Sequence, residues 1–395
     1  MTSGDFEVQV FLGLGAGRFA APVSYSVGTR PEVRAVADLN SDTLLDVVVG
    51  DQLDETVTVL YGDGADGLLF PNTIPLPVNT NVRDVDVVDV TGDGNVDLVL
   101  AQRGNHAVGI LAGNGSGGFL PLVMVPGNTA PAAVAVGDLN GDTHLDLVTV
   151  RENAGEVAVI LADGLGGFAA PVKYPDGGNG KDVVLMDLDK DGNLDVVAAV
   201  LGPDLAVLLG DGAGGLGAYT AYDGGAGEHR VLDVDGDGEQ DLLIGVGGIV
   251  FVKSDLAGGL VDVGRLLTGP GPIAFWPGDL DGDPNLDLVV MHASVRTIRI
   301  ALAEAPFQYD PPSIPTENSL GWAACGDFDE DGWPDVVRSN PNANTLSVFL
   351  GDGQGSLALA ATLSYPGALA QDVAVGDPDG DGHQDLACSS RDTGT

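Results

Sequence analysis

Short apolar runs alternate with polar, glycine-rich segments along the whole chain. Two of these runs, Ala132 to Val136 and Leu147 to Val150, flank an acidic stretch. Runs of this length that are rich in β-branched side chains and bounded by turn residues are typical of strands, and no helical periodicity surrounds them. The pattern therefore predicts an all-β protein.

The acidic stretch recurs eight times at a near-constant interval. Successive copies begin 46 to 51 residues apart, with first aspartates at Asp38, Asp89, Asp138, Asp187, Asp233, Asp279, Asp327 and Asp377. Self-similarity at such a period indicates an array in which each repeat of about 48 residues is one supersecondary unit.

Each repeat is predicted to hold four short strands, A to D. In the first repeat, strand A ends at Asp38, strand B begins at Asp46 and strand C spans Thr56 to Leu60. A glycine turn such as Gly113 to Phe119 leads into strand D, and since no helix follows it we interpret it as a hairpin turn, not a phosphate-binding loop. This turn is degraded in the fifth repeat (254–259) and nearly lost in the sixth (303–307).

The two ends of the chain complement each other. The chain opens with strands C and D (Glu7 to Leu12, Ala21 to Val27) and closes with strands A and B (Asp372 to Gly376, Asp385 to Cys388). We predict one domain over residues 1–395, an eight-bladed β-propeller of four-stranded antiparallel blades. Its eighth blade would join both termini and hide two sheet edges. The alternative, an open solenoid, needs capping repeats that the sequence lacks.

The acidic phrase reads Asp-x-(Asp/Asn)-x-Asp-x-x-x-Asp. Counted from the first aspartate, side-chain oxygens fall at positions 1, 3 and 5, a backbone carbonyl is available at 7, and a carboxylate closes the loop at 9. A tight loop wraps calcium in this way, whereas an EF-hand closes with glutamate at 12 between two helices. Asp-Gly clusters can also be plain turns, but eight copies in register favour metal binding.

We predict up to eight structural Ca²⁺ ions. The predicted ligands are Asp38, Asn40, Asp42, Leu44 and Asp46 in the first loop, Asp89, Thr91, Asp93, Asn95 and Asp97 in the second, Asp138, Asn140, Asp142, His144 and Asp146 in the third, Asp187, Asp189, Asp191, Asn193 and Asp195 in the fourth, Asp233, Asp235, Asp237, Glu239 and Asp241 in the fifth, Asp279, Asp281, Asp283, Asn285 and Asp287 in the sixth, Asp327, Asp329, Asp331, Trp333 and Asp335 in the seventh, and Asp377, Asp379, Asp381, His383 and Asp385 in the eighth.

The eight loops are not equal. The first three have one carboxylate fewer, because position 3 is Asn40, Thr91 or Asn140, and fewer ligand charges predict weaker binding. Position 6, where a sharp turn favours glycine, is another residue in three loops: Thr43, Thr143 and Pro284. Since proline cannot reach positive φ, we expect the sixth loop to be distorted or poorly occupied.

The formal net charge of −42 belongs mostly to these loops, whose 29 aspartates are half of the 58 acids. Eight calcium ions would reduce the charge to −26. Such a field repels phosphate backbones and anionic lipid, so nucleic acid and membrane surfaces are not expected partners. Without calcium the carboxylates repel one another, which predicts that metal binding is coupled to folding.

Compartment is indicated by calcium and cysteine usage. No apolar run reaches transmembrane length, and the first residues carry no signal peptide pattern. Low-affinity calcium loops need the millimolar calcium outside cells, so we expect an extracellular or cell-surface location. Cys325 aligns with core valines of other repeats and Cys388 ends a strand; a disulfide between them is an alternative that we do not favour.

The strand–loop–strand phrase Val134 to Asp142, continued by Leu145 to Val148, resembles the FG-GAP/VCBS repeat of integrin α-subunit propellers and of many secreted bacterial proteins. The resemblance covers nearly the whole chain. It implies a propeller with calcium in the A–B loops, in an extracellular setting of adhesion or carbohydrate binding. Integrin propellers have seven blades and fewer calcium loops, so their partners are not transferred. Eight-bladed calcium propellers also occur among rhamnogalacturonan lyases, which are longer.

A ligand is expected on the face formed by the B–C and D–A loops, opposite the calcium loops. The candidate ligand residues there are Arg103, His106, Arg151, Glu228, His229, Arg230, His292 and Trp322. His144 and His383 are expected to be exposed bystanders apart from their carbonyls, and Trp333 is expected to be more exposed than Trp322.

We interpret the chain as a binding module for a glycan or a surface protein. One alternative is a polysaccharide lyase in which a histidine abstracts a proton beside a uronate and arginine neutralises the carboxylate. Another is a passive scaffold in a larger surface protein. No Ser-His-Asp, zinc or nucleotide motif is present to support other chemistry.

Overall fold

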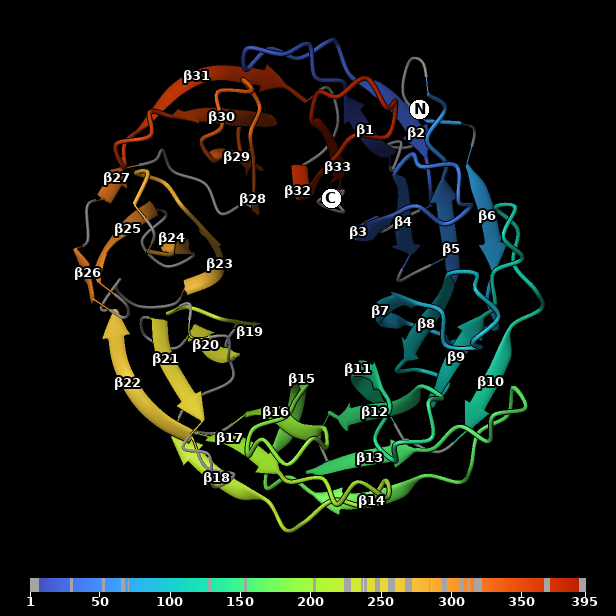
Figure 1. Cartoon of the computed structure of the whole chain (residues 1–395). Helices are drawn as coiled ribbons and strands as arrows, with labels where there is room; N and C mark the ends of the chain where they lie inside the picture. The colour runs from blue at the N-terminus through green and yellow to red at the C-terminus, as the bar shows by residue number, and fades with distance from the viewer. Residues whose placement is uncertain are drawn as a thin grey trace. The chain divides into compact units, whose positions relative to one another are not determined.

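The structure, a computed structural model, describes most of the chain. The described part leaves out residues 1–6, 29–30, 52–53, 65–67, 70, 127–129, 153–154, 202–203, 224–228, 236, 238–239, 246–248, 255–259, 267–271, 284, 293–296, 306–307, 311–312, 316–321, 366–369 and 391–395. Within the described residues all regular secondary structure is β-strand, as predicted (Figure 1). Within these residues no helix is long and apolar enough to cross a bilayer.

The strands form eight antiparallel sheets, which confirms the predicted β-propeller fold with eight blades. Contacts divide the chain into two compact units, residues 77–267 and residues 1–76 with 268–395. Each blade is numbered here by the acidic loop that it contains. The prediction of a single domain stays a prediction.

The unit of residues 77–267 contains blades 2 to 5. In each of them the strands pair in sequence order, A to D. Blade 2 is β7 (Val82–Val88), β8 (Asp97–Gln102), β9 (Ala107–Leu111) and β10 (Val123–Pro126); blade 3 is β11 (Pro131–Gly137), β12 (Asp146–Arg151), β13 (Glu156–Ile160) and β14 (Val172–Pro175); blade 4 is β15 (Asn179–Met186), β16 (Asp195–Leu201), β17 (Asp204–Leu208) and β18 (Thr220–Asp223); blade 5 is β19 (His229–Leu232), β20 (Asp241–Gly245), β21 (Ile249–Ser254) and β22 (Leu260–Leu266).

The other unit contains blades 1, 6, 7 and 8. Blade 1 is β3 (Pro31–Ala37), β4 (Asp46–Asp51), β5 (Thr56–Leu60) and β6 (Asn72–Pro75); blade 6 is β23 (Pro272–Gly278), β24 (Asp287–His292), β25 (Thr297–Ala305), β26 (Gln308–Asp310) and β27 (Ser313–Pro315); blade 7 is β28 (Ala323–Gly326), β29 (Asp335–Asn340), β30 (Thr345–Gly351) and β31 (Leu357–Ser364); blade 8 is β32 (Ala370–Gly376), β33 (Asp385–Ser390), β1 (Glu7–Phe11) and β2 (Val23–Ser26).

Blade 6 departs from the predicted four strands. Strand C, β25, continues to Ala305, and both β26 and β27 pair with it in place of one strand D. Two features of the sequence account for this. The glycine turn that would end strand C is nearly lost, and Pro311 and Pro312 separate β26 from β27 with residues that cannot donate to a ladder.

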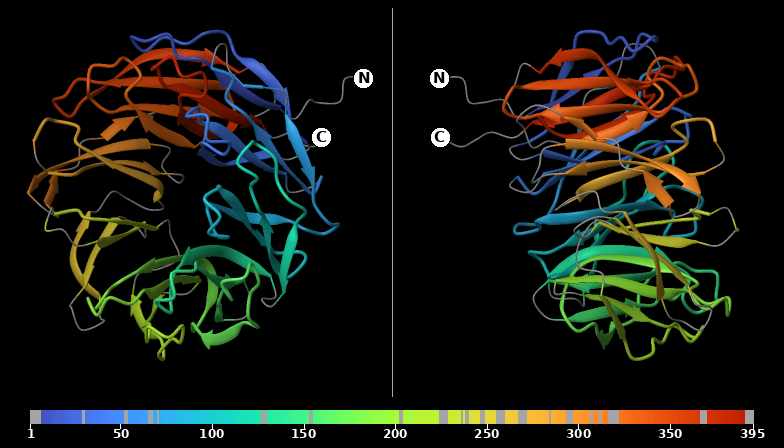
Figure 2. Two further views of the ribbon diagram at one scale, coloured as in Figure 1. Left: turned by 45° about the vertical axis from the view of Figure 1, so that its right-hand side comes forward. Right: turned by 90° about the vertical axis from the view of Figure 1, so that its left-hand side faces the viewer.

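The core lies between neighbouring blades. Strand B is buried along its whole length in β4 and β8, whereas strand D, as in β6, is mostly exposed. A strand covered on both faces reads as a continuous apolar run, which is why strand B lacks polar alternation. Between blades 3 and 4, Val148 and Val150 join one cluster with Val183 and Val196. Figure 2 shows the sheets of the unit of residues 77–267 following one another in two views.

Blade 8 unites strands from both ends of the chain, as predicted. Its spatial order is β2-β1-β33-β32, and Gln9 pairs with Cys388 across the junction. The buried Tyr365 of the neighbouring blade donates its hydroxyl hydrogen bond to the Cys388 carbonyl at 3.1 Å. Cys388 is buried, Cys325 is partly buried, and neither forms a disulfide.

Candidate functional site

Each acidic loop connects strand A to strand B and is shaped by its own aspartates. In the seventh loop, Asp327 at position 1 accepts hydrogen bonds from the N–H groups of Asp331 (3.2 Å) and Gly332 (3.0 Å). Asp331 at position 5 accepts one from the Trp333 N–H (2.9 Å). Because these carboxylates satisfy N–H groups farther along the chain, the backbone curls around their side chains. The same bonds recur in the first, third and eighth loops.

Two positions in the curl are left-handed. Position 6 has φ between 72° and 91° wherever the structure describes it, including the non-glycine residues Thr43 and Thr143. Position 4 is also left-handed, and its occupants include Ser41, Lys190 and Glu330. Position 4 carries glycine in five loops, as many as position 6, so both were predictable from the sequence, although only position 6 was predicted. Pro284 lies outside the described residues, so the expected defect of the sixth loop stays a prediction.

Thr143→Gly is expected to stabilise the protein by about 0.5–1 kcal/mol. A β-branched residue with φ of 72° is strained by about 1–2 kcal/mol, and the larger unfolded-state entropy of glycine offsets part of the gain. Urea denaturation measures the difference. The matched control is the reverse change, Gly192→Thr, at the same position of the fourth loop. Its added Cβ meets nothing within 4 Å, so any loss of stability there is conformational. Equal stability of all three proteins would contradict this account.

The aspartate at position 9 is buried and ties two turns together. Asp335 is 0% exposed; its Oδ2 accepts the Phe328 N–H (2.7 Å) and its Oδ1 accepts the Gly351 N–H (2.8 Å). Phe328 is position 2 of the same loop, and Gly351 ends strand C. The same pair of bonds occurs at Asp195 with Leu188 and Gly210. The acidic loop and the glycine turn of a blade therefore share one face.

Carboxylates converge in the last five loops. Positions 1, 3 and 9 each offer an oxygen within 4.8 Å of the others, in the groups Asp187, Asp189 and Asp195; Asp233, Asp235 and Asp241; Asp279, Asp281 and Asp287; Asp327, Asp329 and Asp335; and Asp377, Asp379 and Asp385. In the first and third loops the amides of Asn40 and Asn140 instead donate to the position 5 carboxylates of Asp42 (2.9 Å) and Asp142 (3.0 Å). These five aspartate groups could hold a metal ion.

The eighth loop tests whether a hard cation fits. Its position 2 is Pro378, which has no N–H to give to Asp385 Oδ2. That oxygen is buried, Asp385 being 2% exposed, and within the described residues it has no hydrogen-bond partner. It belongs to the group formed with Asp377 and Asp379. Such an oxygen-only donor set suits calcium or another hard cation.

The pKa values of the position 9 aspartates also favour a bound cation. Burial, and after it the neighbouring carboxylates, raise the pKa of Asp46, Asp287 and Asp335 to about 6 and that of Asp385 to about 7, against the opposing effect of their N–H hydrogen bonds. These carboxylates are therefore costly to ionise when no cation is beside them. A bound divalent ion would remove that cost.

Comparison with known families decides the identity of the repeat. The model of the FG-GAP-like repeat matches residues 38–100, 89–149, 138–198 and 327–388, together more than half of the chain. The chain belongs to the FG-GAP-like repeat family. The resemblance drawn from the sequence is thereby confirmed. No curated protein sequence matches the chain.

Solved structures share the fold of this FG-GAP propeller at low sequence identity. An Agrocybe aegerita lectin, described as recognising non-reducing terminal N-acetylglucosamine, is 17% identical, with 99% of this chain and 96% of that one covered and a TM-score of 0.50. The WD40 domain of SCAP from fission yeast is 11% identical over 96% and 98%, with a TM-score of 0.56. BBS1N in complex with ARL6DN is 11% identical over 98% of both chains, with a TM-score of 0.52. At these identities the likeness shows the fold alone.

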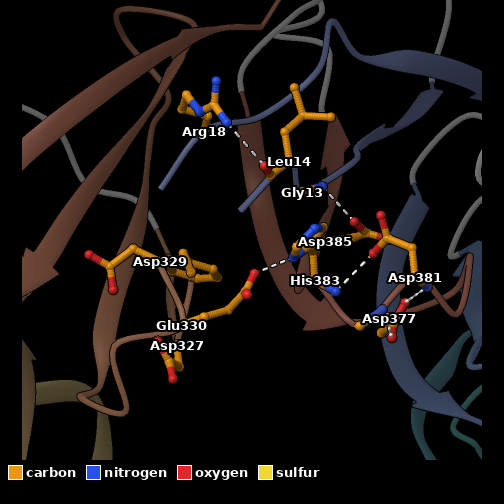
Figure 3. Close-up of polar contacts among 12 residues, drawn as sticks. Gly13, Leu14, Arg18, Asp327, Asp329, Glu330, Asp377, Asp381, His383 and Asp385 are labelled. Carbon is orange, nitrogen blue, oxygen red and sulfur yellow. Dashed lines mark hydrogen bonds and ion pairs between the residues drawn. The ribbon is translucent and has the colours of Figure 1, made fainter. Parts of the chain in front are cut away.

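Neighbouring FG-GAP loops touch each other through His383. The expectation of an exposed bystander is wrong for this residue, because its Nδ1 is hydrogen-bonded to Oε1 of Glu330 at position 4 of the seventh loop (Figure 3). This hydrogen bond raises the pKa of His383. Both residues lie on variable loop positions, so sequence periodicity does not reveal their contact. His144, in contrast, is exposed as expected.

The order expected for two tryptophans is reversed. Trp333 is half-buried because its ring lies over glycines of two turns, Gly353 and Gly282, where an added Cβ would come within 3 Å of the indole. Trp322 is 46% exposed and immediately precedes β28. Its position before strand A places Trp322 on the B–C and D–A loop face, so Trp322 is the better candidate for stacking on a ligand.

On that face, two of the three predicted ligand arginines, Arg103 and Arg151, are paired with neighbouring acids. Arg103 Nε lies 2.8 Å from Glu152 Oε2, and Lys181 Nζ lies 2.9 Å from Glu152 Oε1, so one glutamate links blades 2, 3 and 4. Arg151 is paired with Glu156 at 3.0 Å. These ion pairs were not visible in the sequence, because each partner lies in another strand or blade.

The predicted histidines have diverse positions. His106 adopts φ of 57°, and its Nδ1 accepts the Ala130 N–H of the next blade at 3.0 Å. Glu228 lies outside the described residues. For His229 and Arg230, in β19, and His292, in β24, only the backbone is described. The described residues therefore do not assemble these candidates into one site.

Proposed function

We propose that this FG-GAP propeller is a calcium-stabilised extracellular binding module that recognises a glycan on the face opposite its acidic loops. The observation that carries the calcium role is the buried, unpartnered Asp385 oxygen within a group of three aspartates. Up to eight ions were predicted from the sequence. Because oxygen loops of this kind bind weakly when used in extracellular modules, we place the protein where calcium is millimolar.

The glycan is suggested by Trp322. An exposed indole beside loops is suited to stacking on the apolar face of a sugar ring. The fold likeness to a lectin is consistent with this choice. A lyase is less well supported, since Arg103 and Arg151 are paired with acids and His106 Nδ1 accepts a backbone hydrogen bond. A surface-protein partner or a scaffold role would be the outcome if glycans fail.

The test is a panel of soluble polysaccharides incubated with calcium-loaded protein and assayed for binding and for new unsaturated or reducing ends. Binding without new ends is expected, and Trp322→Ala should weaken it about tenfold or more, as for a central aromatic contact. Leu165→Ala, an exposed change in a glycine turn on the calcium side, is the control and should bind normally. New polysaccharide ends would identify an enzyme. The absence of both binding and new ends would contradict glycan recognition.

A further inference from the structure

Strand C of blade 5 has a lysine beside the fifth acidic loop, at a position where the other blades have no charged residue. Strand C places one residue opposite the position 9 aspartate, and in β21 the register Leu242 to Val252 puts Lys253 opposite Asp241. The same register in the other seven blades selects apolar or aromatic residues only: Tyr61, Ala112, Leu161, Leu209, Leu302, Leu350 and Leu12. A cation at this position is therefore specific to blade 5.

The ammonium group of Lys253 lies among three of the predicted calcium ligands. Its Nζ is hydrogen-bonded to Oδ2 of Asp235, lies 2.7 Å from Oδ2 of Asp237 and lies 3.8 Å from Oδ1 of Asp241. These aspartates are positions 3, 5 and 9. Lys253 is 21% exposed and Asp241 is 1% exposed, so a partly exposed ammonium group lies beside a buried carboxylate.

Asp241 also differs from its counterparts. In other blades Oδ1 of the position 9 aspartate accepts an N–H from the end of strand C, as Asp195 does from Gly210 at 2.7 Å. Within the described residues Asp241 Oδ1 has no hydrogen-bond partner, and Lys253 is the cation beside it. The residues that follow β21, 255–259, lie outside the described part.

We propose that the fifth loop does not bind calcium and that the Lys253 ammonium group takes the place of the ion. Calcium needs six to eight oxygens at 2.3–2.6 Å, and an ammonium group directs its three N–H bonds at the same oxygens. A calcium ion would have to expel the tethered cation and leave it beside a double positive charge. This inference rests on the proposed calcium role of the other loops.

Two consequences follow for the whole chain. The number of calcium ions cannot exceed seven. Blade 5 keeps one positive charge beside the carboxylates of its strand A to strand B turn at any calcium concentration, because its cation is part of the chain. Calcium loss would therefore open the other loops first.

The test counts calcium ions bound to the full chain at equilibrium, by dialysis and elemental analysis. The double change Asp235→Asn/Asp237→Asn in the fifth loop is compared with Asp189→Asn/Asp191→Asn at the same positions of the fourth. We expect the fourth-loop variant to lose one ion per chain and the fifth-loop variant to lose none. Loss of one ion from the fifth-loop variant would overturn the inference while leaving the calcium role intact.

A second variant adds the reciprocal test. Lys253→Met introduces an apolar residue, as in the other blades, and should gain one ion per chain, whereas Lys253→Arg should gain none. An unchanged count in a folded Lys253→Met protein would also overturn the inference. If that variant does not fold, the asparagine pairs decide. A wild-type chain that binds no calcium would contradict the proposed calcium role, and this inference with it.

Discussion

Asp335→Ala is expected to lower the free energy of unfolding by about 2–5 kcal/mol, even in excess chelator. The substitution removes the acceptors of two N–H groups, that of Phe328, which is buried, and that of Gly351, which is part-buried, and an unsatisfied buried donor costs about 1–3 kcal/mol. Urea denaturation in chelator measures this effect without any contribution from metal. The position 9 aspartate is thus expected to be a structural residue as well as a predicted ligand.

Two further variants separate these roles. Asp331→Ala removes an exposed carboxylate of the same loop and should change the free energy of unfolding in chelator by less than about 1 kcal/mol, as surface substitutions usually do. Asp335→Asn keeps one acceptor oxygen and should fall between the two alanine variants. If Asp331→Ala and Asp335→Ala were equally destabilising in chelator, the structural role of position 9 would be wrong.

Removing calcium should lower the melting temperature by more than about 10 °C. Each site held at 10 to 100 times its Kd stabilises the folded state by about 1.4–2.7 kcal/mol, and several such sites together approach the whole stability of a typical domain. Differential scanning calorimetry with 10 mM calcium or with excess chelator measures the change. Magnesium at the same concentration is the control and should restore little, because it gives up its water ligands reluctantly. An unchanged melting temperature would contradict the calcium role.

The pH dependence of the chelated protein gives a second signature. The pKa values of Asp335 (about 6) and Asp385 (about 7) are raised above the unfolded value, so the folded state binds more protons. The contribution of these two carboxyl groups to the stability of the chelated protein is therefore greatest below pH 4. This contribution is lost as the pH rises through 6 and 7. The calcium-loaded protein should show the opposite trend, because protons compete with the ion. Parallel curves would contradict the assignment.

The fold was predictable because each repeat carries the same local sequence signals for loops and strands. Aspartates at odd positions shape the loop, apolar runs define strands A to C, and the incomplete first and last repeats predict the shared eighth blade. The exception was blade 6, where the missing glycine turn was noticed in the sequence but its result, a split strand D, was not. Loss of a turn signal does not say where the partner strand will re-form.

The site was predictable only where it is local in sequence. Positions 1, 3 and 9 of one loop converge because nine residues determine the curl. His383 with Glu330, Arg103 with Glu152, and Trp333 over Gly282 are contacts between blades, and spacing along the chain does not determine which variable residues meet. Lys253 had a visible signal, a lysine at an apolar register position, but only the pairing of β21 with β20 places it opposite Asp241.

The pairing of β1 with β33 also determines how the protein responds to tension. Val8 lies opposite Ser389 and Phe11 opposite Leu386, so the two chain ends leave the sheet at the same end of this antiparallel pair. A pull on both ends loads the hydrogen bonds one after another, as in a zipper, instead of all together in shear. Blade 8 would then yield at a lower force than a pair of strands loaded in shear. The eighth blade therefore joins the two ends of the chain through a strand pair that opens one hydrogen bond at a time.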